Sequence, residues 1–543
     1  MTVDLAAALT ANARRRPDRP ALVLPTGRWH RAGTAGFRVT TYADLDRRSE
    51  ALAAGLSVAG IGPGTRTAML VPPGEDFFAL VFALLKAAAV PVLVDPGMGL
   101  RNVGTCLSEA RPGAFVAVPR GHLAARALRW CPEASVRVTT RGRLPGVLSL
   151  RAVERRGADP ARRLPARKPG DAAVVAFTSG STGVPKGVEL TVGNLLAQVE
   201  LIRDLYDLRP GEVSLATFPP FALLGPALGL TTVVPRMDPT RPAAVDSRRL
   251  VDAVRTYGAS VMFGSPALLD TLVRWAGPRG ETMPTLRRVV SAGAPVAPAL
   301  QRCVLDLLPP GAQVHSPYGA TEALPVTSIG SDELLALPER PLTGVCVGRP
   351  VPGVDVTVVP ITDEPLPEVD PRAALPPGEV GEVVVRGPVV TRAYVERPAA
   401  TARAKTRWDG RLAHRMGDAG YLDEAGRLWF CGRTAHRVTT PHGVMFSVPC
   451  EQVFDAHPAV RRSALVGVGP AGQQLPIICV ELERGVRASG ELTAQLLDLA
   501  ASTPETKAIG TVVYVRRFPV DVRHNAKIRR EELARLAARR LRR

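Results

Sequence analysis

The sequence predicts an α/β protein that is built from more than one domain. Its 543 residues exceed what a single hydrophobic core usually serves, so at least two domains are expected. Hydrophobic residues make up 46% of the chain and charged residues 22%, which is typical of a folded globular protein. Segments with helical periodicity alternate with short runs of strand-forming residues, and this alternation favours helices packed on sheets.

The first part of the chain alternates between helices and strands. Apolar residues recur at helical spacing over residues 5–16 and 42–60, so both segments are predicted to be helices. Short apolar runs bounded by turn residues predict strands at residues 66–71, 90–95 and 114–118.

The next element is a loop whose composition predicts phosphate binding. Residues 174–177 and 187–191 are strand-like, and between them stands TSGSTGVPKG, residues 178–187. Glycines let backbone N–H groups approach an anion, hydroxyls add donors, and Lys186 neutralises charge. A Walker A loop would place Ser or Thr after the lysine and open a helix, whereas Gly187 and a strand follow here. The loop therefore predicts a phosphate site of another kind, the alternative being a flexible surface turn.

The last part of the chain returns to strands before a final helix. Strand-forming residues dominate residues 344–430, apart from an acidic, proline-rich loop at residues 360–379. Near the C-terminus, Leu533, Leu536 and Leu541 recur near helical spacing among arginines. This pattern predicts a packed helix with a basic outer face rather than a membrane anchor.

Composition argues against several classes of protein. Seven scattered cysteines without C-x-x-C pairing indicate neither a disulfide framework nor a zinc site, and they suit a reducing cytoplasm. No segment has the uninterrupted apolar length of a membrane helix, and the N-terminal residues lack the apolar core of a signal peptide. The net charge of +19 is spread along the chain without interleaved aromatics, so nucleic-acid binding is not expected as the main function.

Lysine is rare in this chain, which draws attention to two loops. Only six of the 69 basic residues are lysine, at positions 86, 168, 186, 405, 507 and 527. Lys186 and Lys527 nevertheless stand in the two loops that look most like motifs. Arginine and lysine are not interchangeable where a compact charge meets a phosphate or carboxylate oxygen, so both lysines are candidates for such a contact.

Six motifs, in the expected order, resemble those of the acyl-adenylate-forming (AMP-dependent synthetase/ligase) superfamily. They are FTSGSTGVPKGV (177–188), SAGAP (291–295), SPYGATE (316–322), HRMGD (414–418), CGR (431–433) and HNAKIRREEL (524–533). The resemblance covers essentially the whole chain. It implies a large, multi-subdomain adenylate-forming domain at residues 1–432, followed by a small, mobile α+β lid domain at residues 433–543 that carries the catalytic lysine.

The resemblance also implies roles for single residues. Tyr318 would stack on adenine, Thr321 would contact phosphate, and Glu322 would hold Mg²⁺ as a hard oxygen ligand. Asp418 would accept hydrogen bonds from both ribose hydroxyls, and Arg433 would lie near the ribose or a phosphate. The implied ATP-binding set is Thr178, Ser179, Gly180, Ser181, Thr182, Gly183, Lys186, Gly293, Ala294, Pro295, Tyr318, Gly319, Ala320, Thr321, Asp418, Arg433 and Lys527.

The implied catalytic residues are Lys527, Glu322 and Thr182. The carboxylate of the substrate attacks the α-phosphate, so an anion must approach an anion. Lys527 would bridge the substrate carboxylate and the nucleotide, and Lys527 and Mg²⁺ would stabilise the charge that develops in the transition state.

Two positions depart from the usual pattern of the superfamily. Amino-acid-activating relatives place an aspartate after a phenylalanine to bind the substrate amine, and many acyl-CoA ligases place a histidine there, whereas this chain has Ala222. Relatives commonly have Asp or Lys two residues after Gly-Arg at the hinge, whereas this chain has Ala435. Amino-acid activation is therefore disfavoured, and the large domain rotation of CoA-using members is in doubt.

These departures, together with several strings, resemble the β-lactone synthetases of long-chain olefin biosynthesis. The strings include FALLGPALG (221–229), MDPTRPA (237–243), GVCVGRP (344–350) and GRTAHRV (432–438). The resemblance implies an enzyme that uses ATP to convert a 2-alkyl-3-hydroxy fatty acid to a β-lactone, releasing AMP and pyrophosphate. The lipid substrate would meet Phe221, Ala222 and Gly225, although the same apolar stretch could be plain core.

Three alternatives share much of this pattern. A long-chain fatty acyl-CoA ligase and an acyl-AMP ligase that loads a carrier protein would have the same ATP motifs. A non-catalytic nucleotide- or lipid-binding relative is disfavoured because Glu322, Asp418 and Lys527 are all present. Association with other enzymes of the same lipid pathway is a further expectation.

Overall fold

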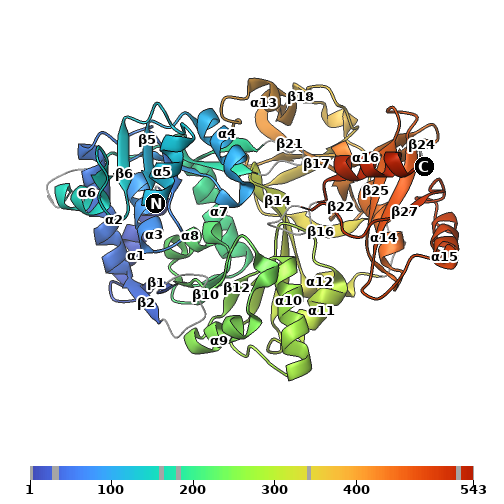
Figure 1. Ribbon diagram of the computed structural model, residues 1–543, viewed down its shortest axis with the longest axis horizontal. Coiled ribbons are helices and arrows are strands. Elements are labelled where there is room, and N and C mark those ends of the chain that lie inside the picture. Colours follow the sequence, from blue (N-terminus) through green and yellow to red (C-terminus); the bar gives the residue numbers. More distant parts are fainter. Residues whose placement is uncertain are drawn as a thin grey trace.

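The computed structural model describes residues 4–26, 36–157, 164–178, 185–338, 344–520 and 528–541. Within them, two large sheets and two small ones carry the fold (Figure 1). Helices and strands alternate through the first half of the chain, and this mixed α/β arrangement confirms the predicted fold class. None of the described helices is long and apolar enough to cross a membrane.

The first sheet contains seven strands in the order β7-β6-β5-β3-β4-β8-β9. All neighbouring pairs are parallel except β8 and β9, which form the antiparallel pair on either side of the predicted phosphate loop. The strands predicted at residues 66–71, 90–95 and 114–118 are confirmed as β3, β4 and β5. The bounds are β3 Arg66–Leu70, β4 Val90–Leu93, β5 Ala114–Ala117, β6 Val136–Thr139, β7 Leu148–Ser149, β8 Ala172–Thr178 and β9 Lys186–Thr191.

The second sheet is larger and changes character at one hairpin. Its 15 strands follow the order β17-β19-β21-β22-β16-β15-β14-β13-β12-β10-β11-β1-β2, with β18 and β20 off this path. From β11 to β14 the neighbours are parallel, whereas from β14 to β19 they are antiparallel. The β14–β15 hairpin therefore lies where the two halves of the sheet meet.

The strands of this second sheet include the run predicted at residues 344–430. Their bounds are β1 Pro20–Pro25, β2 Phe37–Thr41, β10 Val213–Ala216, β11 Thr231–Val233, β12 Val261–Phe263, β13 Arg288–Val290, β14 Gln313–Ala320, β15 Ala323–Gly330, β16 Val345–Pro350, β17 Asp355–Val359, β18 Glu368–Val369, β19 Gly381–Arg386, β20 Lys405–Trp408, β21 Arg411–Leu422 and β22 Leu428–Arg433.

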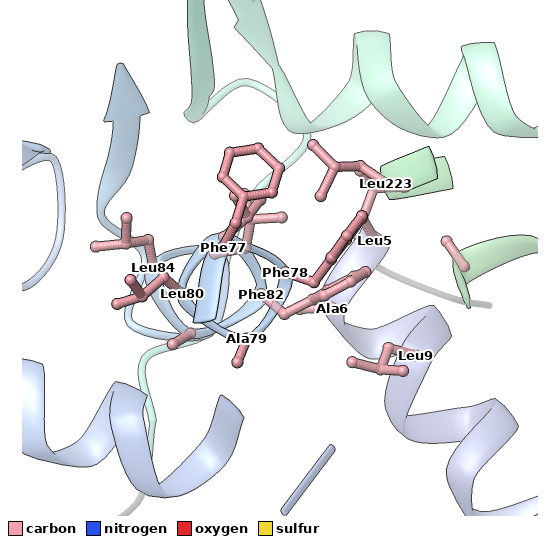
Figure 2. Packing of buried hydrophobic residues seen from close by; sticks show 14 of the residues in the cluster. Leu5, Ala6, Leu9, Phe77, Phe78, Ala79, Leu80, Phe82, Leu84 and Leu223 are labelled. Carbon is pink, nitrogen blue, oxygen red and sulfur yellow. The ribbon is translucent and has the colours of Figure 1, made fainter. Parts of the chain in front are cut away.

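The main core forms around one helix that is apolar on every side. Figure 2 shows Phe77, Phe78 and Phe82 of this helix, α3, beside Leu5 of α1 and Leu223 of α8. Such a helix must be surrounded, because a helix without a polar face has no side to present to water. The helices of this part are α1 Leu5–Arg15, α2 Tyr42–Val58, α3 Glu75–Lys86, α4 Leu100–Ala110, α5 Pro119–Ala127, α6 Leu150–Arg156, α7 Val192–Leu205, α8 Pro219–Leu228, α9 Ser247–Tyr257, α10 Pro266–Ala276, α11 Pro298–Leu305, α12 Ser331–Ala336 and α13 Pro398–Ala404.

The C-terminal region has its own sheets and its own cores. The three strands β25, β26 and β27 form one sheet, and β23 and β24 form a separate pair. Two hydrophobic clusters contain only residues of this region. The elements are β23 Val438–Thr440, β24 Gly443–Met445, α14 Ser447–Asp455, β25 Val460–Val468, β26 Leu475–Leu482, α15 Gly490–Ala501, β27 Val512–Tyr514 and α16 Arg530–Leu541.

The final helix is present, but one of its three predicted packing residues is not buried. Leu533 is fully buried and Leu536 packs against the same cluster. Leu541 is 43% exposed, and it is the last residue of α16. The prediction that Leu541 packs into the core is therefore wrong.

Polar contacts join the C-terminal region to the large sheet. The side-chain amide of Gln452 accepts from the backbone N–H of Gly344 at 3.1 Å and donates to its carbonyl at 3.0 Å. Arg437 pairs with Asp363 of the acidic loop at 2.6 Å. The β22 strand ends at Arg433, and the next sheet begins at Val438. The boundary at residues 432 and 433 and the mobility of the smaller region stay predictions.

Candidate active site

Three residues predicted to hold adenosine come together on adjacent strands. Asp418 of β21 and Arg433 of β22 are direct neighbours in the sheet, because these strands pair in antiparallel register. Arg433 donates to one oxygen of the Asp418 carboxylate at 2.7 Å and to the Met416 carbonyl at 3.1 Å. The Tyr318 hydroxyl, from β14, donates to the other carboxylate oxygen at 2.6 Å. Asp418 is 4% exposed, and its carboxylate is held on both oxygens.

The electrostatics of this trio favour a charged Arg433 and a neutral Tyr318. The Asp418 carboxylate raises the pKa of Arg433 above its usual value. Burial, followed by the neighbouring carboxylate, raises the pKa of the Tyr318 hydroxyl. Tyr318 therefore stays a neutral hydrogen-bond donor at neutral pH. A carboxylate fixed in this way is suited to accept hydrogen bonds from a vicinal diol.

The turn between β14 and β15 presents Glu322 to a second group of residues. One carboxylate oxygen of Glu322 accepts a hydrogen bond from the Tyr394 hydroxyl at 2.7 Å. The Lys186 ammonium lies 4.9 Å from the centre of the Tyr394 ring, within the range of a cation–π contact. Burial lowers the pKa of Lys186, and the Glu322 carboxylate opposes this effect. Lys186 and Glu322, which are 136 positions apart in the sequence, thus lie in one electrostatic environment.

The hairpin that carries Tyr318 and Glu322 requires a glycine between them. A β-carbon added to Gly319 would lie 2.6 Å from the Ala323 carbonyl oxygen and 2.9 Å from a Leu324 methyl. No side chain fits there without moving the hairpin. Ala320 pairs with Ala323 across the hairpin, and Thr321 and Glu322 form the turn itself.

The turn is also braced by residues that the sequence did not single out as site residues. The Glu322 carbonyl accepts from the backbone N–H of Thr391 at 2.9 Å and from its hydroxyl at 3.0 Å. The same hydroxyl accepts from the ammonium of Lys405 at 3.1 Å. Tyr394, Thr391 and Lys405 belong to no motif, and only the rarity of lysine gave a signal for one of them. Burial lowers the pKa of Lys405 to about 7, and Glu322 opposes this shift.

The loop predicted to border adenine follows β13. The Ser291 backbone N–H donates to the His315 carbonyl at 2.9 Å, which ties the loop to β14. The Ser291 hydroxyl is buried and has no hydrogen-bond partner in the described part of the chain. Gly293 has a φ of +96°, which favours glycine and turns the chain toward Ala294 and Pro295. For these three residues the structure gives the position in the loop, and their contact with a nucleotide stays a prediction.

An apolar pocket lies beside the β14–β15 hairpin. It is lined by residues of α7, α8, β10, β12 and β13, and it reaches Pro317, next to Tyr318. Phe221 and Gly225 line this pocket, and Phe221 stacks on Phe263 with ring centres 4.0 Å apart. Ala222 is fully buried in the main core instead. Of the three residues predicted to contact the lipid, the structure thus brings two to the pocket.

Gly225 has a packing reason that is independent of any ligand. A β-carbon at this position would collide with the hydroxyl of Thr232 on β11. The glycine lets α8 approach the sheet closely, and Phe221 is thereby held at the wall of the pocket.

Several predicted residues lie outside the described residues. These are Lys527 and, in the phosphate loop, Ser179, Gly180, Ser181, Thr182 and Gly183. Thr178 and Lys186 flank that loop and face each other in the β8–β9 register. Val520 and Ile528, which flank the segment that contains Lys527, form an isolated β-bridge.

The chemistry of the site fits a divalent cation only together with a polyphosphate. In the described ranges, no cluster of three or more His, Cys, Asp or Glu side chains could hold a metal ion on its own. Glu322 offers a single carboxylate beside two lysines, so the remaining oxygen ligands would have to come from phosphates and water. The lysines in turn suit the negative charge of those phosphates.

Comparison with known proteins identifies the family of the chain. The family model described as AMP-binding enzyme matches residues 9–395. The chain is 48% identical to the olefin beta-lactone synthetase of Xanthomonas campestris pv. campestris, with 98% of this chain and 97% of the relative aligned. It is 47% identical to the olefin beta-lactone synthetase of Stenotrophomonas maltophilia over the same shares.

Solved structures support the fold. An anthranilate CoA ligase in complex with anthranoyl-AMP superposes with a TM-score of 0.80 at 19% identity, covering 99% of this chain and 98% of the other. The amide bond synthetase McbA from Marinactinospora thermotolerans superposes with a TM-score of 0.75 at 25% identity, covering 95% and 97%. The predicted resemblance is confirmed, and the chain belongs to the AMP-binding enzyme family, with olefin beta-lactone synthetases among its relatives.

Proposed function

We propose that this enzyme converts a 2-alkyl-3-hydroxy fatty acid to a β-lactone through an acyl-AMP intermediate, with release of pyrophosphate and AMP. One observation carries the proposal. The chain is 48% identical, over 98% of its length, to a protein named olefin beta-lactone synthetase. The fold of this chain brings Lys186, Glu322, Asp418 and Arg433 together around one hairpin.

In the first half-reaction, a carboxylate oxygen of the lipid bonds to the α-phosphorus of ATP, and the bond to the leaving pyrophosphate breaks. Lys186 and Arg433 place positive charge around Glu322 and Asp418, which offsets the repulsion between the two anions. Tyr318 and Asp418 would fix the adenosine, and Pro317, the residue next to Tyr318, lines the apolar pocket that would hold the lipid.

Glu322 is the residue that we assign to Mg²⁺, which would neutralise phosphate charge when bound. Tyr394 holds one oxygen of this carboxylate, and Thr391 fixes the backbone of the same residue. One solved relative of the same fold, an O-succinylbenzoate coenzyme A synthetase from Bacillus subtilis, is described in complex with ATP and magnesium.

In the second half-reaction, the 3-hydroxyl oxygen of the bound lipid attacks the carbonyl carbon of the acyl-AMP. The C–O bond to the phosphate breaks, AMP leaves with the bonding electrons, and the hydroxyl proton passes to a base. A nucleophile tethered to the same molecule needs no second substrate, because proximity supplies its effective concentration. The four-membered ring is strained, and this explains why its formation is coupled to ATP cleavage.

The apolar pocket is assigned to an alkyl chain of the substrate. Its walls are almost wholly apolar, and Pro317, Leu324 and Pro325 of the β14–β15 hairpin are among its lining residues. We place the enzyme in a reducing cytoplasm, which is supported by the seven cysteines scattered along the chain without C-x-x-C pairing. Partner enzymes of the same lipid pathway remain part of the proposal.

Product analysis tests the proposed reaction. The purified enzyme is incubated with ATP, Mg²⁺ and a racemic 2-alkyl-3-hydroxy fatty acid, without CoA or carrier protein. We expect β-lactone and AMP in equal amounts. Product formation that depends on CoA or on a holo-carrier protein would replace the proposal with an acyl-CoA ligase or a carrier-loading ligase.

A further inference from the structure

Lys405 is a buried basic residue to which the proposed mechanism assigns no role. Lys405 is the first residue of β20 and is 9% exposed. Within the described ranges, no carboxylate forms an ion pair with its ammonium. Lys86, whose side chain is 7% exposed, is different, since it pairs with the Asp46 carboxylate at 2.6 Å. An ammonium buried without a carboxylate partner is costly, so its retention needs a reason.

The hydrogen bonds of Lys405 lead directly to Glu322. A charged ammonium can only donate, so the Thr391 hydroxyl must accept from Lys405 and use its single proton elsewhere. That proton goes to the Glu322 carbonyl, which also accepts from the Thr391 backbone N–H. Lys405 thus fixes the direction of the hydrogen bond that holds the turn.

The surroundings of Lys405 favour a role in charge balance. His414, its direct partner across β20 and β21, is 3% exposed and donates through Nδ1 to the Ala404 carbonyl. Burial and the nearby Lys405 lower the pKa of His414 well below its usual value, so His414 is neutral. The Glu322 carboxylate raises the pKa of Lys405 against the effect of burial. The same carboxylate raises the pKa of Lys186.

We infer that Lys405 is a positioning residue for the metal and polyphosphate part of the site: it holds the Glu322 turn through Thr391 and supplies a buried positive charge beside it. The inference rests on the proposed function, because that function assigns Glu322 to Mg²⁺. Lys405 does not touch the reacting atoms. It acts through the Thr391 hydroxyl and through its charge, which the bound polyphosphate would balance.

The test is nucleotide binding to the intact enzyme, measured by calorimetry with ATP and with AMP in the presence of Mg²⁺. We expect Lys405→Met to raise the Kd for ATP roughly tenfold and to change the Kd for AMP much less, because AMP lacks the outer phosphates. Thr391→Val should give the same selective loss, whereas Thr391→Ser keeps the hydroxyl and should bind ATP like the wild type.

Lys86→Met is the matched control, because it removes a lysine whose side chain is 7% exposed and whose partner, Asp46, lies in α2. It should lower the melting temperature through the loss of its ion pair with Asp46, and it should leave both Kd values unchanged. Lys405→Met should have a melting temperature at or above that of the wild type, because an unpaired buried ammonium is removed.

An ATP affinity of Lys405→Met equal to that of the wild type would overturn the inference, and so would an equal loss of ATP and AMP binding. If Lys405→Met does not fold, the Thr391→Val and Thr391→Ser pair decides by the same criterion. Lactone formation by the wild-type enzyme is measured separately. A wild-type enzyme that binds ATP but forms no lactone would contradict the proposed function. The ATP and AMP dissociation constants of the variants would still test the role of Lys405.

Discussion

At the scale of single residues, the site depends on which neighbour each acidic group has. Arg433 and Tyr318 donate hydrogen bonds to the Asp418 carboxylate. The Glu322 carboxylate accepts one hydrogen bond from Tyr394 and interacts electrostatically with Lys186 and Lys405. The first arrangement suits recognition of neutral hydroxyls, and the second suits a cation shared with phosphates. Two carboxylates close in space are thereby given different roles.

Glu322→Gln tests the assigned metal ligand. The neutral amide oxygen is a weaker ligand for a hard cation, so we expect the Mg²⁺ concentration for half-maximal pyrophosphate release to rise roughly tenfold or more. The control is Glu333→Gln, which removes an exposed carboxylate paired with Arg349. A Mg²⁺ titration of Glu322→Gln that matches the wild type would remove Glu322 from the metal site.

Lys527→Ala tests the lysine of the terminal loop. Loss of a charge donor at the transition state should lower the rate of adenylation by about 10²–10³-fold, while ATP binding weakens far less. Lys527→Arg should also be slow, because a planar guanidinium does not replace a compact ammonium. The exposed Lys507 gives the control Lys507→Ala. Near wild-type pyrophosphate release from Lys527→Ala would contradict the assignment.

The residues that the sequence did not reveal are those that only the fold brings to the site. Lys186, Glu322 and Asp418 stand in motifs whose composition indicates phosphate, metal or ribose binding. Thr391, Tyr394 and Lys405 stand in a stretch without motif composition, and they reach Glu322 because the chain returns to this hairpin about 70 residues later. Local patterns do not record such non-local contacts, so sequence reasoning had no basis for assigning Thr391 and Tyr394, and only the rarity of lysine pointed to Lys405.

At the scale of elements, short buried strands were predictable and sheet order was not. The strands at residues 66–71, 90–95 and 114–118 have apolar runs that fit a parallel sheet covered on both faces. Nothing in these runs indicates that β3 lies between β4 and β5, or that β14 joins the parallel and antiparallel halves of the larger sheet. Pairing depends on tertiary packing between distant segments, and this packing positions the hairpin of Tyr318 and Glu322.

Gly319→Ala tests whether that hairpin is an element of fixed shape. The added methyl group meets the Ala323 carbonyl and Leu324, and such overpacking costs about 1–3 kcal/mol. The hairpin must shift, so we expect a lower melting temperature together with weaker ATP binding. Gly36→Ala is the control, because a β-carbon there has no neighbour within 4 Å among the described residues. Unchanged ATP binding in Gly319→Ala would show that the hairpin tolerates the shift.

At the scale of the whole molecule, buried histidines predict a loss of stability in mild acid. Burial lowers the pKa of His315 to about 4 and that of His436 to about 3, and it lowers the pKa of His414 well below its usual value. The unfolded chain takes up these protons near pH 6.5, whereas the folded protein does not. Stability therefore falls as the pH drops below 6.5, by about 1.4 kcal/mol per pH unit for each histidine that stays neutral in the folded state.

The measurement is the melting temperature between pH 7.5 and pH 4.5. His436→Gln removes one of these groups, so its melting temperature should fall less steeply with acid than that of the wild type. His442→Gln, at an exposed position, should follow the wild type. Parallel curves for His436→Gln and the wild type would show that His436 does not contribute to acid unfolding.

The central claim is that the second nucleophile is the 3-hydroxyl of the substrate itself, and a substrate without that hydroxyl tests it most directly. The enzyme is given ATP, Mg²⁺ and a 2-alkyl fatty acid that lacks the 3-hydroxyl, with and without CoA, and AMP and acyl products are quantified. We predict that the deoxy acid is at most adenylated and stays bound, so that free AMP appears only by slow hydrolysis, and that CoA changes nothing. Formation of acyl-CoA from the deoxy acid, at a rate comparable to lactone formation from the hydroxy acid, would contradict the account.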